Sequence, residues 1–357
     1  MRQFLARHQT PVLLIVALAV IAALTAVIGA DDIQVTLTEM LIRVTVVVGL
    51  YVFIGNSGII SFGHIGFMCI GAYAAAWATA EPSFKGIMLQ GLPSLLQDNQ
   101  FPFPVAMAGA IILPALVAAL FGLAIMRLAG TAASIATFAF LIIVNSVYSN
   151  WDSVTAGVSS IIGIPTVVGP WTAFWFAAAA ILAAYLFQIS RFGLLLRASR
   201  EDDVAARASA VHTIRMRLAA FVLSAALVGA GGGLYAQFLG ILTVDPFYLG
   251  LSFITIAMLV VGGMSSLTGS VLGVVVVTAI VQVLRVFERG IPVGGTTLAL
   301  PAGSQELGLG LLLAVILIFR PNGLSRGWEM AVLRSGPAKA TDGAVLLTSD
   351  PNTLNAR

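Results

Sequence analysis

The most restrictive feature of this chain is a series of ten apolar runs, most of them long enough to cross a bilayer. They cover approximately residues 11–30, 37–54, 59–80, 103–126, 132–150, 171–190, 218–241, 251–264, 269–287 and 306–319. A membrane-spanning helix takes about 20 mostly apolar residues, so ten spans use about 200 of the 357 residues. The sequence therefore predicts an all-α polytopic membrane protein. We expect residues 1–334 to form one transmembrane domain, with no room for a separate catalytic domain.

Composition excludes several other classes of protein. Only 9% of the residues are charged and 59% are hydrophobic, whereas soluble proteins carry about 25% charged residues. The net charge of +3 gives no reason to expect a nucleic-acid partner. Neither lysine, Lys85 nor Lys339, stands in a phosphate-binding G-x4-G-K-[ST] loop. No metal-ligand set, nucleophile or cofactor motif is visible, so we expect a chain that is not an enzyme and has no ATPase site of its own; if ATP drives this protein, another chain hydrolyses it.

The arginines predict the orientation in the membrane. Segment 191–217 and the segment from Arg320 to Lys339 each carry an excess of three positive charges, while the loops near Asp31, Asp98 and Asp152 are neutral or acidic. Basic loops favour the cytoplasmic side. With a cytoplasmic N-terminus, six spans return the chain to the cytoplasm at 191 and four more return it at 320. We expect both termini to be cytoplasmic and residues 335–357 to form a disordered tail.

Two of the apolar runs are interrupted by glycines. The first interruption, from Gly55 to Gly66, and a weak echo from Gly262 to Gly273 suit an inverted repeat with broken or re-entrant helices. Runs 132–150 and 251–264 are short enough to be re-entrant. In a bilayer, backbone groups released by such a break must be buried in protein or line a wet cavity. The alternative is that the glycines only let helices pack closely.

The first interruption is a candidate substrate path. A half-helix that begins near Ser61 would present its positive end to a carboxylate, and small hydroxyls there could contact cargo. The candidate residues of this path are Gly55, Ser57, Gly58, Ser61, Gly63, His64, Gly66 and Thr137. His64 by itself is more typical of a hydrogen-bonded packing residue than of a ligand.

The second candidate region is the polar connection 191–217. Glu201, Asp202 and Asp203 fall in the first turn of a short helix, where they complement its dipole, and Ala205 with Ala206 form a small face that a partner could accept. A solvated loop that only sets topology is the alternative. The candidate functional residues of this connection are Arg197, Arg200, Glu201, Asp202, Ala205, Ala206 and Ala210.

These regions resemble a known family. Gly55 to Tyr73 is similar to the block G-x-x-G-x-x-S-x-G-H-x-x-F-x-x-I-G-A-Y of the branched-chain amino-acid ABC transporter permeases, the LivM subfamily, and Ser190 to Ala206 to its S-R-x-G-x-x-L-R-A-x-R-E-D-E-x-A-A segment. Matches continue to the closing segment from Phe319 to Leu324. The chain departs from the pattern at Ala210, where the family usually has glycine, and at Ala156, the first position of a G-G-S-D-G-L-x-G-I-P loop.

The resemblance implies the membrane subunit of an ABC importer in the bacterial inner membrane, with 191–217 as its coupling helix. Implied partners are a second, LivH-like permease, two ABC ATPase subunits that hold ATP and Mg²⁺, a periplasmic or lipoprotein binding protein, and membrane lipid. The cargo could be branched-chain amino acids, urea, short amides or other amino acids. An ion-coupled secondary transporter is the alternative from another class, although such carriers usually bury functional acids within their spans.

Overall fold

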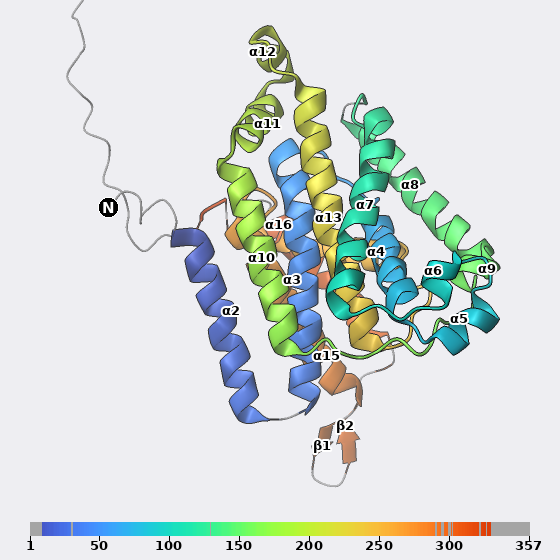
Figure 1. Ribbon diagram of the computed structural model, residues 1–357. Helices are drawn as coiled ribbons and strands as arrows, with labels where there is room; N and C mark the ends of the chain where they lie inside the picture. The colour runs from blue at the N-terminus through green and yellow to red at the C-terminus, as the bar shows by residue number, and fades with distance from the viewer. Residues whose placement is uncertain are drawn as a thin grey trace, which may run out of the picture.

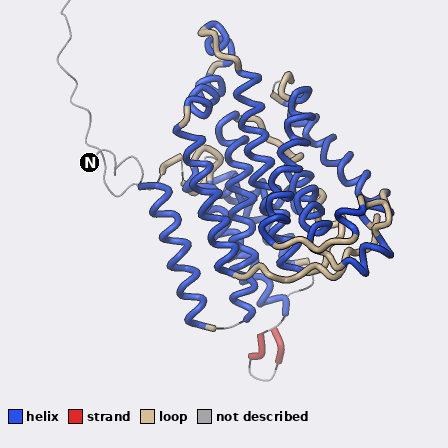
Figure 2. The backbone as a smooth tube through the Cα atoms, viewed as in Figure 1, coloured by secondary structure: helices blue, strands red, loops and turns tan. Residues whose placement is uncertain are grey.

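The computed structural model describes residues 9–29, 31–128, 130–289, 291–293, 296–298, 301, 303–320, 323–325 and 327–329. In this part of the chain the fold is almost entirely helical (Figure 2), with one short hairpin in which Pro292 lies opposite Thr297. The elements are α2 (Gln9–Ile28), α3 (Asp31–Ser57), α4 (His64–Thr79), α5 (Pro82–Met88), α6 (Ser94–Gln97), α7 (Phe103–Ile125), α8 (Thr131–Asn150), α9 (Asp152–Thr155), α10 (Pro170–Ile189), α11 (Arg191–Glu201), α12 (Asp203–Ala208), α13 (Thr213–Leu239), α14 (Leu249–Gly262), α15 (Leu267–Arg289), β1 (Ile291–Val293), β2 (Thr296–Leu298) and α16 (Ser304–Phe319). The predicted tail 335–357 lies outside the described residues.

Ten of these helices coincide with the ten apolar runs. Among the described residues, seven are long and apolar enough to cross a membrane: α2, α3, α7, α8, α10, α13 and α15. Helix α8 is one of them, so the run 132–150 has the length of a full span. Helices α4 and α16 have 16 residues and α14 has 14. At about 1.5 Å per residue, none of these three covers the hydrocarbon core when it stands upright.

Helices α3, α4 and α13 form the centre of the bundle. Most of α3 is buried, including Leu41, Val47 and Phe53. Its apolar residues surround most of its circumference and do not form a single stripe. Helix α13 packs against α3, α4 and α7 at once. A helix that is apolar on all sides suits the interior of a membrane bundle, and these elements hold the interrupted segment in place.

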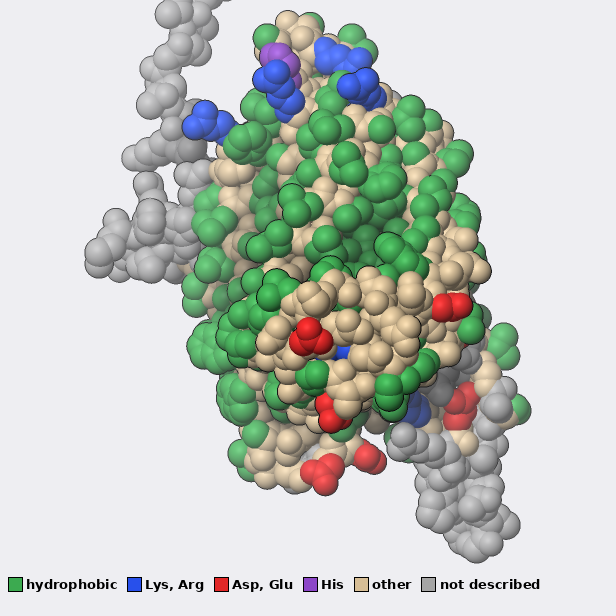
Figure 3. Space-filling model, turned by 45° about the vertical axis from the view of Figure 1, so that its right-hand side comes forward, with side chains coloured by type: hydrophobic (Ala, Val, Ile, Leu, Met, Phe, Trp, Pro, Cys, Tyr) green, Lys and Arg blue, Asp and Glu red, His purple; other side chains and the backbone are tan. Residues whose placement is uncertain are grey.

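The direction of the chain places the polar connections at two ends of the bundle. In Figure 1 the chain descends in α2, rises in α3, descends in α4, rises in α7, descends in α8 and rises in α10. Helices α11 and α12 therefore stand at the end where α2 begins, and α5, α6 and α9 lie toward the opposite end. The space-filling view (Figure 3) shows most of the visible blue Lys and Arg side chains at the top, the end of α11 and α12. The visible red Asp and Glu side chains lie in the lower half of the view.

Candidate transport site

The polar connection after α10 is a structured elbow of two short helices, α11 and α12. The Ser190 hydroxyl accepts a hydrogen bond from the Gly193 amide (3.3 Å) and caps α11, and the Asp202 carboxylate accepts from the amides of Val204 and Ala205 (2.9 Å each) and caps α12. Serine and aspartate at these positions satisfy amides that have no partner within the helix. The elbow ends at His212, so the last five residues of the predicted segment 191–217 belong to α13.

The acidic and alanine positions of the elbow differ in part from the prediction. Glu201 ends α11 instead of beginning a helix, and only Asp202 and Asp203 stand at the start of α12. Ala205 is exposed, but Ala206 is buried and faces the protein. The expected smooth pair of alanines is therefore not a single outward face; Val204, which is 80% exposed, lies beside Ala205 instead.

Two arginines of α11 tie the elbow to spans. The guanidinium of Arg197 donates to the carbonyl of Gln188 near the end of α10 (2.8 Å). The guanidinium of Arg200 donates to the carbonyl of Gly55 in the last turn of α3 (2.7 Å). A Cβ at Gly58 would lie 3.0 Å from Arg200 Cγ, and Gly58 has φ +72°. Glycine at 58 thus allows both the left-handed turn and the approach of Arg200.

The chain between α3 and α4 is interrupted, as the glycine pattern predicts. Helix α3 ends at Ser57 and α4 begins at His64, three residues later than the expected start near Ser61. The Ser57 hydroxyl donates to the carbonyl of Phe53 (2.7 Å) and accepts from the Ile59 amide (3.2 Å). The Ser61 hydroxyl lies 2.7 Å from His64 Nδ1. Both hydroxyls therefore have partners inside the chain.

Two other residues of the predicted path, Gly63 and Gly66, pack against α8, and a third, Thr137, belongs to α8 itself. A Cβ at Gly63 would overlap the carbonyl oxygen of Thr137, and one at Gly66 would lie 3.2 Å from the ring of Phe140. The Thr137 hydroxyl donates to the Ser134 carbonyl (2.8 Å) and the side chain is buried. The close contact makes glycine necessary at 63, and a substrate role for these residues stays a prediction.

A second interruption, between α14 and α15, lies against the first one. The carbonyl oxygen of Met264 is 2.8 Å from the position of a Cβ on Gly55. The Glu329 carboxylate accepts from the amides of Leu267 (2.9 Å) and Thr268 (3.1 Å) and so caps α15. An acid suits this positive end of a helix, and sequence reasoning missed it because residue 329 is distant in the chain.

A cavity of about 430 Å³ lies where the end of α3, the elbow and the second interruption meet. Its wall consists of Ile54, Ser57, Gly58, Ile59, Gly130, Ser199, Arg200, Asp203, Arg217 and Met264. Among the predicted residues it brings together Ser57, Gly58 and Arg200.

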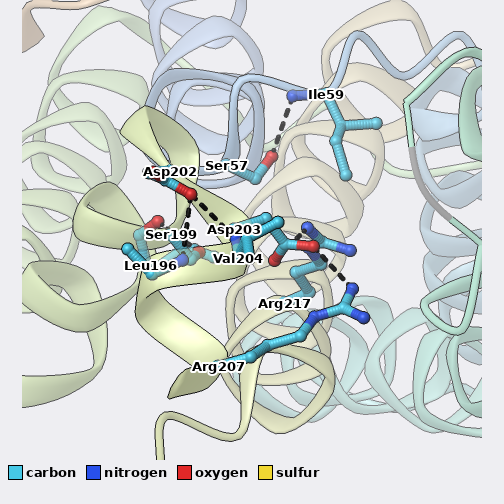
Figure 4. A network of polar contacts seen from close by, with 10 residues as sticks. Ser57, Ile59, Leu196, Ser199, Asp202, Asp203, Val204, Arg207 and Arg217 are labelled. Carbon is cyan, nitrogen blue, oxygen red and sulfur yellow. Dashed lines mark hydrogen bonds and ion pairs between the residues drawn. The ribbon is translucent and has the colours of Figure 1, made fainter. Parts of the chain in front are cut away.

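A charged pair lines this cavity where the elbow meets α13. Arg217 belongs to the first turns of α13, is only 7% exposed, and donates to Asp203 (3.2 Å). Asp203 also pairs with Arg207 (Figure 4). The sequence shows that Arg217 is a basic residue just inside a predicted span. It does not show the partner of Arg217, because Asp203 reaches it only when the elbow folds back toward α13.

On the opposite end, Lys85 anchors the connection between α4 and α7. Its ammonium group donates to the carbonyls of Leu96 and Asn99 (2.6 Å each) and of Trp77 (3.2 Å). Burial lowers the pKa of Lys85 below its ordinary 10.5, and the nearby Asp98 carboxylate opposes this shift. One lysine thus fixes α5 and α6 against the end of α4.

Interruptions within a bundle of apolar helices are typical of membrane transport proteins. The family model described as the permease component of branched-chain amino acid transport systems matches residues 33–319. The chain belongs to this family and is a permease subunit of the branched-chain amino acid type.

Two curated relatives are each described as the high-affinity branched-chain amino acid transport system permease protein LivM. The one from Salmonella typhimurium strain LT2 is 27% identical over 349 residues, which cover 87% of this chain and 73% of the relative. The one from Escherichia coli K12 is 27% identical over 330 residues, which cover 83% and 70%. No solved structure matches the chain.

Proposed function

We propose that this permease imports branched-chain amino acids and is driven by ATPase subunits that dock on the α11–α12 elbow. The observation that carries the proposal is the hydrogen bond from Arg200 to the Gly55 carbonyl. It joins the elbow directly to the point where a central span is interrupted. A displacement of the elbow therefore pulls on the end of α3, so closure of the ATPases can open the path beside it.

The distribution of charge supports a cytoplasmic elbow. The basic elbow stands at the end where α2 begins, and acidic side chains gather toward the other end (Figure 3). The positive-inside tendency then places the elbow and both termini in the cytoplasm of a bacterial inner membrane. The connection with α5, α6 and α9 then faces the periplasm, where a binding protein delivers cargo.

We infer the remaining partners from the resemblance of the motifs. A second, related permease completes the membrane part, and two ATPase subunits bind ATP and Mg²⁺. Within the described residues no group of three or more histidine, cysteine or acidic side chains is placed to hold a metal ion.

Crosslinking tests the docking surface. Ala205→Cys in the assembled transporter should crosslink to an ATPase subunit, because Ala205 is exposed on α12. Leu95→Cys on α6, where the native side chain is 67% exposed, is the control and should not. The native Cys69 is buried and does not interfere. An intact complex in which Ala205→Cys finds no ATPase partner rules out the elbow as the docking surface.

Uptake measurements test the cargo. A strain that lacks this chain should lose binding-protein-dependent uptake of leucine, and the restored chain should recover it. Retained leucine uptake together with lost urea uptake would instead assign the chain to amide transport. Concentrative leucine transport by the purified chain alone, on an ion gradient, would favour the secondary-transporter class.

A further inference from the structure

We propose that the 430 Å³ cavity between α3, the elbow and the α14–α15 interruption is a release site for the zwitterionic backbone of an α-amino acid. The proposal rests on the proposed function and names the chemistry of its cargo. The carboxylate would be bound by Arg200 and Arg217, the ammonium by Asp203, and the aliphatic side chain would contact Ile54, Ile59 and Met264.

The charged side chains of the cavity have both signs. Arg200 and Arg217 stand against Asp203 in its wall, while Arg207, the second partner of Asp203, is exposed at its surface. The carboxylate of a zwitterion can replace Asp203 as the partner of Arg217 while its ammonium group pairs with Asp203, so no buried charge is left unpaired. A ligand with a single charge uses only one of these two contacts, because Asp203 keeps Arg207 as a partner and is only partly buried.

An unused donor points to a ligand in addition to the ion pair. The Nε of Arg217 is buried and has no hydrogen-bond partner among the described residues. The Arg217 side chain as a whole is more than nine-tenths buried. Buried polar atoms in proteins nearly always have a partner. A carboxylate can accept two parallel hydrogen bonds from one guanidinium, so a bound carboxylate would satisfy this atom.

Size and lining also fit a small amphiphilic ligand. Pockets for small molecules usually have volumes of about 300–1,000 Å³ and combine apolar walls with a few polar groups. The cavity has about 430 Å³, an apolar side formed by Ile54, Ile59 and Met264, and a charged side formed by Arg200, Asp203 and Arg217. An uncharged amide such as urea would use neither side fully.

The position of the charged groups explains how the cargo would leave. Arg200 lies on α11 and Asp203 on α12, whereas Arg217 lies on α13. When the elbow moves, Arg200 and Asp203 therefore move away from Arg217. The movement of the elbow that opens the path would therefore also weaken binding of the amino acid in the cavity. Release of the cargo would in this way be coupled to closure of the ATPases.

Protection of a cysteine measures binding without relying on transport. Ser199→Cys in the assembled transporter, without nucleotide, places a thiol in the cavity wall, and Ser57→Cys is a second position if the first variant does not assemble. Leucine should slow maleimide labelling of this thiol. Urea and 4-methylpentanoate, which is leucine without its ammonium group, should not. Labelling of Val204→Cys, outside the cavity, should not respond to leucine.

Charge variants complete the test. Asp203→Asn should raise the leucine concentration needed for protection by about tenfold or more, because a charge-assisted hydrogen bond is lost. Asp202→Asn removes the same charge one residue earlier and still caps α12, so protection should be unchanged. Equal protection by 4-methylpentanoate, equal protection in Asp203→Asn, or no protection while the same complex imports leucine would each overturn the release site and leave the proposed function standing.

Discussion

Two alanines have backbone conformations that ordinarily favour glycine. Ala156 has φ +61° and Ala210 has φ +59°, and they are the only non-glycine residues with positive φ in the described part of the chain. A left-handed backbone crowds the Cβ atom and costs about 1–2 kcal/mol. Both positions are those where the resembled family has glycine, so the departures noted in the sequence carry backbone strain.

Ala210→Gly should therefore raise the free energy of unfolding by about 0.5–1 kcal/mol, because the relief of strain exceeds the greater freedom of glycine in the unfolded chain. Thermal unfolding of the purified protein in detergent measures the change. Ala205→Gly, inside α12, is the matched control and should lower stability by about 0.5–1 kcal/mol. A lower melting temperature for Ala210→Gly would contradict the left-handed assignment.

Lys85→Met should lower the free energy of unfolding by about 2–3 kcal/mol, because three buried carbonyls lose their common donor. Gln90→Met, an exposed position on the same connection, should change it little. The pKa of Lys85 is lower in the folded protein than the ordinary 10.5, so the unfolded chain binds more protons in the window below 10.5. The stability contributed by Lys85 should therefore rise with pH there.

That pH dependence is measured as the difference in melting temperature between the native chain and Lys85→Met, at pH 8 and again near pH 10. The difference should grow at the higher pH. A difference that shrinks with rising pH would mean that the folded structure favours the charged ammonium more than the unfolded chain does.

At the scale of elements, glycines set the distance between α4 and α13. A Cβ on Gly71 would overlap the carbonyl oxygen of Gly229, and one on Gly232 would overlap the carbonyl oxygen of Met68. Small residues allow helices to pack closely in a bilayer. The packing interpretation of the glycines is therefore correct for this pair of helices, while Gly58 serves the interruption itself.

Gly71→Ala should separate α4 from α13, since the obstructing atom belongs to a backbone that cannot rotate away. We expect a loss of stability of about 1–3 kcal/mol. Gly109→Ala on α7, where a Cβ meets nothing within 4 Å, is the control and should be neutral or slightly stabilising. Thermal unfolding compares the two variants, and equal melting temperatures would show that the two helices do not touch as described.

At the scale of the whole molecule, the alternation of helices determines which connections share a side of the membrane. Six helices, α2, α3, α4, α7, α8 and α10, run alternately down and up between the start of α2 and the elbow, so these two lie at one end of the bundle (Figure 1). The connection with α5 and α6 follows the third of these helices and lies toward the other end.

Single cysteines in intact cells test this arrangement. Val204→Cys should react with a membrane-impermeant maleimide only after the membrane is opened, and Leu95→Cys should react from outside the membrane. Both side chains are well exposed, at 80% and 67%, and the native Cys69 is buried. The reverse pattern would mean that the elbow faces the outside of the cell, where the ATPases cannot dock on it.

The sequence by itself determined most of the helices, an interruption between Gly55 and Gly66, and a short helix within the connection 191–217. These features have local causes, since a helix satisfies its own backbone within four residues and glycine, serine and aspartate affect the backbone next to them. The apolar runs also predicted the alternation of helices from α2 to α10, while the side of the membrane on which the elbow lies stays a prediction.

Only the tertiary structure decided which distant residues meet. Arg200 reaches Gly55, Arg217 pairs with Asp203, and Glu329 caps α15, and no local pattern specifies such partners. In a chain that is apolar on nearly every helix face, periodicity does not say which face is buried or which helices are neighbours. Those choices depend on close packing at glycines and on satisfying a few buried charges, which are properties of the assembled bundle.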